Sequence, residues 1–92
     1  SSMKLSDRIT IPQEVIARQM GEETVMLDLA NGAFFGLDLV GARIWQLLME
    51  GKTLVEICEV MVDEYDVTRE NIERDLLALL DDLKAHGLIV PA

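Results

Sequence analysis

The hydrophobic periodicity of this chain changes once, at Asp38, and the change divides the chain into two kinds of secondary structure. Before it, Val25, Leu27 and Leu29 alternate with Met26 and Asp28, which is typical of a strand buried on one face. After it, apolar residues recur every three or four positions, which is typical of amphipathic helices. The sequence therefore predicts strands in the first part of the chain and helices in the second.

The first part is expected to form three strands, over residues 14–20, 23–30 and 33–37. A Gly-Glu-Glu turn separates the first two strands. Asn31 and Gly32 separate the second from the third, and Asn-Gly is a strong hairpin signal because both residues tolerate a positive φ. These features predict a three-stranded antiparallel meander.

Three helices are expected after this meander, over residues 39–50, 53–64 and 68–86. Asp38 and Thr53 are suited to cap the first two, and a glutamate three residues after Thr53 completes a capping box. Either Asp66 or Thr68 can cap the third helix. A short extended tail is expected after Gly87. The predicted fold class is α+β: an N-terminal three-stranded antiparallel sheet followed by a three-helix winged helix-turn-helix body.

The length of 92 residues suits one domain and is too short for two independent cores, so residues 1–92 are expected to form a single domain. The opening "SSM" is expected to be a two-residue cleavage remnant before the native start at Met3, and all three residues are set aside from fold prediction. No signal sequence and no apolar run of about 20 residues is present. The single cysteine, Cys58, can form no internal disulfide. We therefore expect a cytoplasmic protein that does not contact a membrane.

Residues for catalysis are scarce in this sequence. The one histidine, His86, stands beside Gly87 at a predicted helix end, where we expect it to contact the last carbonyls or solvent. Cys58 lies within an apolar helical pattern, which favours a buried small hydrophobe over a nucleophile. Neither has a second metal ligand spaced nearby, and the adjacent carboxylates at positions 63–64 and 81–82 are expected to be solvated. We expect no enzyme activity, no metal and no cofactor.

The charge of the chain is strongly negative, with 17 acidic and 8 basic residues and a net charge of −9. The predicted third helix carries Arg69, Arg74 and Lys84 among five carboxylates. Phosphate would repel a helix of this composition, so no nucleic-acid partner is expected. A winged-helix DNA-binding regulator is kept as an alternative function, and a general protein–protein adaptor as another.

Residues 34–45 read FFGLDLVGARIW and hold three of the four aromatic residues of the chain. Strand alternation sends Phe34 and Phe35 to opposite faces of the sheet. We expect Phe35, Leu37 and Trp45 to fasten the sheet to the helices, with Trp45 largely buried. The aromatic surface that remains is available to line a groove.

Three stretches of the chain resemble the PqqD-like family: GAFFGLDLVGARIWQLL, EYDV and IERDLLALLDDLKAHGLI. Members of this family, also called RiPP recognition elements, are small domains that bind the leader segments of ribosomally made precursor peptides. The resemblance runs from Arg8 to Val90. The opening ITIPQEVIARQMGEETVMLDLANG is most similar to stand-alone members of lasso-peptide pathways, while similar stand-alone members serve other pathways, including pyrroloquinoline quinone synthesis. One departure is the Phe34–Phe35 pair, where tyrosine is commoner in the family, so a phenol hydrogen bond to the peptide would be absent.

The resemblance implies that a leader peptide adds to the third strand as a fourth strand and lies against the third helix. The site residues implied on the strand are Ala33, Phe34, Phe35, Gly36 and Leu37. Those implied on the helix are Asn71, Asp75, Ala78, Leu79 and Asp82. In this arrangement Ala78 leaves room for a bulky leader side chain, and Asp75 or Asp82 pairs with a basic one.

The resemblance also implies a partner enzyme that receives the precursor, either a leader protease or a radical SAM enzyme. An exposed sheet edge could instead pair two copies of the chain, so a homodimer is left open.

Overall fold

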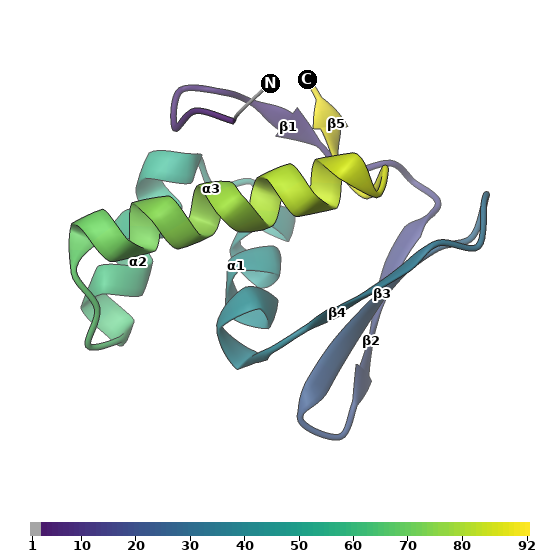
Figure 1. The fold of residues 1–92 in the computed structure, drawn as a ribbon, viewed down its shortest axis with the longest axis horizontal. Coiled ribbons are helices and arrows are strands. Elements are labelled where there is room, and N and C mark those ends of the chain that lie inside the picture. The colour runs from purple at the N-terminus through teal and green to yellow at the C-terminus, as the bar shows by residue number, and fades with distance from the viewer. Residues whose placement is uncertain (1–2) are drawn as a thin grey trace.

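Figure 1 shows the computed structural model of the chain, which describes residues 3–92. A three-stranded sheet lies beside three helices, and a small two-stranded sheet joins the two ends of the chain (Figure 1). The elements in chain order are β1 (Ile9–Thr10), β2 (Val15–Met20), β3 (Glu23–Asp28), β4 (Phe34–Leu37), α1 (Leu39–Met49), α2 (Leu54–Glu64), α3 (Arg69–Ala85) and β5 (Val90–Pro91).

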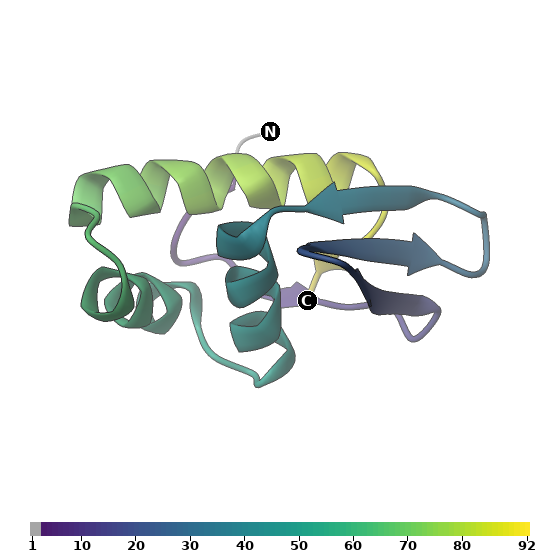
Figure 2. The ribbon, with the colours of Figure 1, turned by 90° about the horizontal axis from the view of Figure 1, so that it is seen from below.

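The larger sheet is antiparallel with the order β2–β3–β4, so the predicted meander is confirmed. Its register places Ile16 opposite Leu27 and Leu27 opposite Phe34. Gly21 makes the tight turn between β2 and β3 at a φ of 67°, which an L-residue with a side chain rarely adopts. In Figure 2, β4 is the strand that runs next to α3, and β2 is the strand farthest from it.

The connection between β3 and β4 differs from the two-residue turn expected at Asn31–Gly32. It spans residues 29–33, and Gly32 alone takes a positive φ, of 76°. Asn31 instead accepts a hydrogen bond from the Ala33 N–H on its side-chain oxygen, at 2.9 Å. The expected third strand is therefore one residue too long, because Asn31 stabilises the loop through its side chain rather than through a left-handed backbone.

The buried face of β3 is the opposite of the one that the apolar alternation suggested. Met26 is fully buried and Asp28 is nearly so, whereas Val25 and Leu27 are half-buried and Leu29 lies in the loop, 67% exposed. The Asp28 carboxylate is tolerated inside because it accepts a hydrogen bond from the Ala30 N–H at 2.9 Å. The period of two was correct, but it could not tell which of two mixed faces meets the helices.

The three helices begin and end close to the predicted positions because their caps are strong. Asp38, Thr53 and Thr68 each accept a hydrogen bond from the backbone three residues later, and Thr53 forms the predicted capping box. Thr68, rather than Asp66, caps α3. The three helices after a three-stranded sheet are as predicted, and their assignment to a winged helix-turn-helix body stays a prediction.

The core lies between the inner face of the sheet and the three helices. Trp45 is 5% exposed, as predicted, and Phe35 packs partly buried against the same core. The other buried hydrophobic residues are Met3, Val15, Met26, Leu37, Ile44, Leu47, Leu48, Leu54, Ile57, Cys58, Met61, Ile72, Leu76, Leu80, Leu83, Leu88 and Ile89.

Two parts of the N-terminal segment were not predicted. Met3, which was set aside from fold prediction, is 6% exposed, and its N–H donates to the Asp81 carboxylate at 2.9 Å. Setting Met3 aside was therefore wrong, as was treating Asp81 as simply solvated. Ile9–Thr10 also pairs with the C-terminal tail as β1 with β5. The expected cleavage remnant at residues 1 and 2 lies outside the described residues.

Over residues 3–92, no helix is both long enough and apolar enough to cross a membrane.

Candidate functional site

The outer edge of β4 carries backbone groups that no other strand satisfies within residues 3–92. The Asp28 N–H donates to the Ala33 carbonyl at 2.8 Å, so Ala33 directs its backbone towards β3. Backbone direction alternates along an antiparallel strand, so Phe35 and Leu37 also face β3. The N–H and C=O groups of Phe34 and Gly36 therefore point away from the sheet.

A hollow of about 420 Å³ lies between this edge and the neighbouring helices. Three elements build it: β4, the first two turns of α1, and the middle of α3. We call it the β4–α3 groove, and its lining residues are Phe35, Gly36, Leu37, Asp38, Val40, Gly41, Ile44, Asp75 and Leu79.

The floor of the β4–α3 groove is apolar and closely packed. Leu37 and Ile44 are each 2% exposed. Gly41 is buried beside them, and a Cβ atom at this position would lie 3.2 Å from Leu37 Cδ2 and 3.3 Å from Asp38 Oδ1. Glycine therefore lets α1 approach the end of β4, and this approach sets the depth of the groove.

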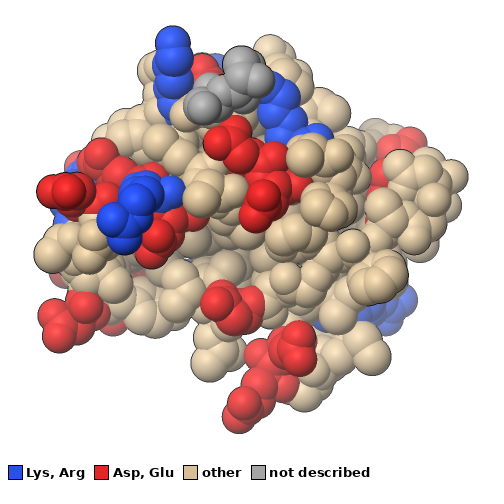
Figure 3. Space-filling view, in the orientation of Figure 1, with Lys and Arg blue, Asp and Glu red and all other residues tan. Residues whose placement is uncertain are grey.

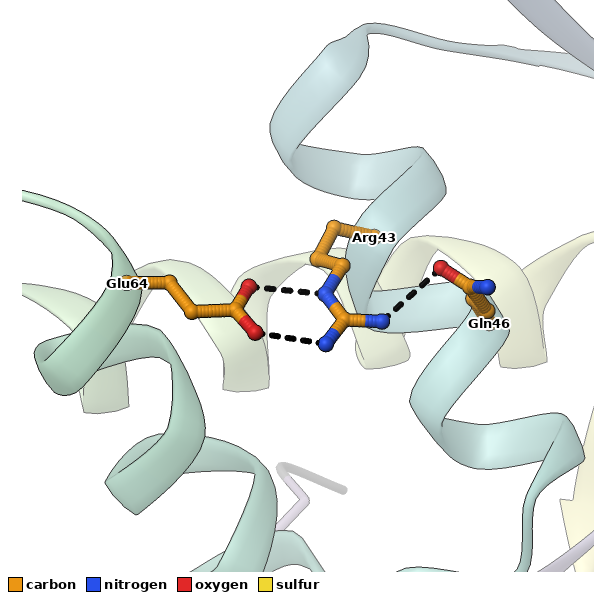
Figure 4. Close-up of polar contacts among 3 residues, drawn as sticks. All are labelled: Arg43, Gln46 and Glu64. Atoms are coloured by element: carbon orange, nitrogen blue, oxygen red, sulfur yellow. Dashed lines mark hydrogen bonds and ion pairs between the residues drawn. The ribbon is translucent and has the colours of Figure 1, made fainter.

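An ion pair links the middle of α1 to the end of α2, as Figure 4 shows. Arg43 donates to both carboxylate oxygens of Glu64, from Nε at 2.8 Å and from Nη2 at 2.6 Å, and its Nη1 donates to Gln46 at 2.8 Å. The hydrogen-bonded pairing raises the pKa of Arg43 and lowers the pKa of Glu64. A bidentate arginine–carboxylate contact of this kind constrains the relative orientation of the two side chains as well as their distance. It therefore helps to hold α1 where it contributes to the groove.

The rim of the groove is acidic. Asp38 and Asp75 both line it and both are exposed. One oxygen of Asp38 accepts the Gly41 N–H at 2.8 Å, while Asp75 has Arg74 at 3.6 Å as a solvent-exposed neighbour. Figure 3 shows that carboxylates outnumber basic groups over the face that carries α3. A cationic ligand is therefore favoured over an anionic one.

His86 lies at the C-terminal end of α3 and contacts the strand side of the site. Its ring packs edge-on against Phe35, with the ring centroids 5.0 Å apart and an angle of 68° between the planes. Its Nδ1 lies 2.8 Å from the Asp82 carbonyl, which can only accept, so Nδ1 is the donor. The predicted contact with the last helical carbonyls is confirmed, and the ring additionally orients Phe35.

The structure brings five of the ten residues implied by the resemblance together in the groove. These are Phe35, Gly36, Leu37, Asp75 and Leu79. Ala33 lies in the loop before β4, and the Phe34 side chain is 69% exposed on the face of the sheet away from the core. The remaining three, which are exposed on α3 and do not line the hollow, are Asn71, Ala78 and Asp82.

Sequence reasoning missed the contribution of α1, which supplies Val40, Gly41 and Ile44 to the groove. An apolar residue in a helix gives no sign in the sequence of facing a hollow rather than the core. His86 could have been found, since its spacing of seven and eleven residues from Leu79 and Asp75 places all three on one side of a helix.

The described residues carry no sign of catalytic chemistry. Over residues 3–92, no three His, Cys, Asp or Glu side chains cluster in a way that could hold a metal ion. Cys58 is a free, fully buried thiol, and burial raises its pKa, which disfavours the reactive thiolate. The predicted role of Cys58 as a buried small hydrophobe is confirmed.

Fold and site together define a small α+β binding domain that keeps one sheet edge open beside a helix. Residues 23–89 match the family model described as coenzyme PQQ synthesis protein D (PqqD), and the chain belongs to this family. The predicted PqqD-like identity is thus confirmed, and with it the classification of the chain as a non-catalytic protein.

Two solved structures are similar to this chain over most of its length. One, described as TbiB1 in complex with the TbiA(beta) leader peptide, is 43% identical, covers 86% of this chain and 92% of its own, and has a TM-score of 0.79. The other, described as lasso peptide synthetase B1 complexed with the leader peptide, is 30% identical, covers 90% of this chain and 98% of its own, and has a TM-score of 0.82. No curated protein sequence matches the chain.

Proposed function

We propose that this protein binds the leader segment of a ribosomally made precursor peptide and delivers the precursor to an enzyme that cleaves the leader or modifies the peptide. Two structural neighbours, at 43% and 30% identity, were each solved with a leader peptide bound, which supports this function. Residues 1–92 would act as one PqqD-like recognition domain, with the helices as a winged helix-turn-helix body that supports peptide rather than DNA.

The observation that carries the proposal is the open edge of β4 beside the β4–α3 groove. Phe34 and Gly36 offer two outward N–H donors and two outward C=O acceptors to an extended peptide. Such main-chain bonds provide affinity without regard to sequence, and pockets for alternate side chains provide selection. A peptide strand on β4 would direct every second side chain towards the groove floor formed by Leu37 and Ile44.

The chemistry of the groove indicates which leader residues it accepts. The floor favours an apolar leader side chain, and the rim carboxylates of Asp38 and Asp75 favour a basic residue close to it. Phe34 and Ala33 would contribute through the backbone of the strand and loop. Asn71, Ala78 and Asp82 would contact parts of the leader that extend along α3 beyond the hollow.

The partner enzyme would be a leader protease or a radical SAM enzyme. Similarity to a lasso peptide synthetase B1 supports a lasso-peptide pathway for this chain.

Strand addition is tested by removing one outward backbone donor. Gly36→Pro lacks the N–H, and proline is tolerated where an edge-strand N–H faces solvent. Gly36→Ala is the matched control, because an added Cβ would meet only Glu23 Oε2 at 3.7 Å. We expect Gly36→Pro to weaken leader binding at least about tenfold, or about 1.4 kcal/mol, and Gly36→Ala to change it little.

The measurement is calorimetric titration with two leaders: the TbiA(beta) leader and the leader of a precursor encoded beside this chain. Thermal melting would establish that both variants remain folded. Equal affinity of folded Gly36→Pro and Gly36→Ala would contradict pairing at Gly36. Failure of the unaltered protein to bind either leader would contradict the proposed function itself.

A further inference from the structure

A second hollow, of about 470 Å³, lies towards the C-terminal end of α1, whereas the β4–α3 groove lies at its start. It is formed by the segment before β2, by the turn from α1 into α2 and by the C-terminal tail. We call it the N-terminal hollow. Its volume is within the range of about 300–1,000 Å³ that is typical of ligand-binding clefts.

The walls of the N-terminal hollow are largely apolar. Leu5, Ile9 and Ile11 line it from the N-terminal segment and pack, partly buried, against the core. On the side of α2, Leu54 is buried and Val55 is 41% exposed. An occupant with apolar side chains would therefore remove exposed apolar surface from water.

The charged side chains of the N-terminal hollow are mainly basic, although the chain as a whole carries −9. Arg8 and Lys52 line the hollow, and neither forms an ion pair among the described residues. The one acidic side chain among the described lining residues, Asp7, accepts the Lys4 N–H at 2.8 Å. The described lining of the β4–α3 groove instead holds two carboxylates and no basic side chain. The two hollows therefore favour ligands of opposite charge.

The two hollows can be occupied at the same time. No described residue lines both of them. The groove begins at Val40 on α1 and the N-terminal hollow reaches α1 at Leu48, which lies about 12 Å farther along the helix axis at 1.5 Å per residue. In Figure 1, β4 enters α1 in the lower part of the view and the N-terminal segment lies at the top. A leader bound in the groove would therefore leave the N-terminal hollow open.

We propose that the N-terminal hollow is the docking site for the enzyme that receives the precursor, through a segment of the enzyme in which Asp or Glu stands beside large apolar residues. The apolar walls take the apolar side chains, and Arg8 and Lys52 take the carboxylate. Most of the surface of this acidic chain repels such a segment, which makes the hollow selective for it.

This inference rests on the proposed function and deepens it. A protein that delivers a precursor has to hold the leader and the enzyme together, and the leader occupies the β4–α3 groove. The enzyme therefore needs a second surface, and the N-terminal hollow supplies one of opposite charge.

Charge reversal at the rim of the hollow tests the docking site. The probe is the purified leader protease or radical SAM enzyme encoded beside this chain, titrated by calorimetry into the protein saturated with its isolated leader. We expect Arg8→Glu to weaken enzyme binding at least about tenfold and to leave the affinity for the leader unchanged. Arg18→Glu is the matched control, because it makes the same charge change at an exposed residue of β2 that lines neither hollow. This control should bind both the enzyme and the leader normally.

Filling the hollow tests its apolar walls. Val55→Trp places an indole in the hollow, and Val62→Trp makes the same change on the same helix at a residue of similar exposure, 38%, that does not line it. We expect Val55→Trp to weaken enzyme binding at least about tenfold and Val62→Trp to leave it unchanged. Thermal melting would establish that all four variants remain folded.

Enzyme binding that is unchanged by Arg8→Glu or by Val55→Trp, in folded protein that still binds the leader, would overturn the inference and leave the proposed function standing. An equal loss of enzyme binding in a matched control would also overturn it. So would a dimer of the leader-free protein, detected by sedimentation and dissociated by Val55→Trp, because it would assign the hollow to a second copy of the chain. Failure of the unaltered protein to bind the leader would instead contradict the proposed function itself.

Discussion

Asp75 places an exposed carboxylate at the rim of the β4–α3 groove, one helical turn from Leu79. Reversal of its charge should repel the basic leader residue that the acidic rim favours. We expect Asp75→Lys to weaken leader binding about tenfold or more, or about 1.4 kcal/mol, as measured by calorimetric titration. Glu59→Lys on α2 makes the same charge change at an exposed site outside the groove and should bind normally. Equal affinity of both variants would remove Asp75 from the site.

Trp45 is the single tryptophan and lies almost fully buried between α1 and the sheet. Truncation of a large buried aromatic side chain leaves a cavity that the surroundings fill only partly. We expect Trp45→Ala to lower the free energy of unfolding by about 3–5 kcal/mol, with a matching fall in the urea midpoint. An unchanged midpoint would mean that the indole contributes nothing to the core.

Single residues show where sequence reasoning succeeds and where it ends. The opposite orientation of Phe34 and Phe35 followed from strand geometry alone. The burial of Met26 in place of Leu27 did not, because a mixed pattern fixes the period of a strand without fixing its buried face. Met3 gave no local signal at all, since its burial depends on a contact with Asp81 across nearly the whole chain.

At the scale of elements, the α1–α2 contact depends on the ion pair of Arg43 with Glu64. The folded-state pKa of Glu64 is lowered, so the pair stabilises the fold above the ordinary glutamate range and loses this effect as pH falls through the folded pKa. Unfolding measured in urea from about pH 7 to about pH 3 should therefore show a smaller acid-induced loss of stability in Glu64→Gln than in the unaltered protein.

Glu59→Gln provides the control for this pH dependence. Glu59 lies on the same helix and forms no ion pair in the part of the chain that the structure describes. The stability of Glu59→Gln should fall with decreasing pH as much as that of the unaltered protein. If Glu64→Gln, Glu59→Gln and the unaltered protein all lose the same stability on acidification, the Arg43–Glu64 pair adds nothing to the α1–α2 contact.

Elements with strong local signals were predicted within one or two residues. The caps Asp38 and Thr53 fixed the starts of α1 and α2, and left-handed Gly51 and Gly87 follow the ends of α1 and α3. The pairing of β1 with β5 had no such signal, because two-residue strands have no measurable period and their partners lie at opposite ends of the chain. Local chemistry therefore predicts where elements begin and end, but not which distant segments meet.

At the scale of the whole molecule, the groove depends on where three elements converge. The edge of β4 and the acidic face of α3 could be anticipated from the order of elements and from the resemblance to the PqqD-like family. The part that α1 plays could not, because Gly41 looks like an ordinary helical glycine until the structure shows that a Cβ there would lie 3.2 Å from Leu37 Cδ2. A site between elements is thus less visible in sequence than the elements themselves.

The charge of the whole molecule leads to the last prediction, which is the absence of DNA binding. The helical body could suggest a groove-reading helix, but carboxylates on α3 outnumber its basic residues. Two of its three cations are also engaged, Arg69 with Glu73 at 2.6 Å and Arg74 with Asp75 at 3.6 Å. Few free cations then remain to release counterions from phosphate, which is the source of most non-specific affinity for duplex DNA.

Binding to duplex DNA would be measured by the fluorescence anisotropy of a labelled duplex at about 0.15 M salt. Any increase in anisotropy would then be followed as the salt concentration is raised. We expect no binding at tens of micromolar protein, for the unaltered protein and equally for Asp75→Lys, since one reversed charge leaves α3 without a cationic surface. Micromolar binding that weakens steeply with added salt would contradict the prediction, because that slope counts phosphates neutralised by the protein. Such binding would also support the alternative function of a winged-helix DNA-binding regulator over peptide recognition.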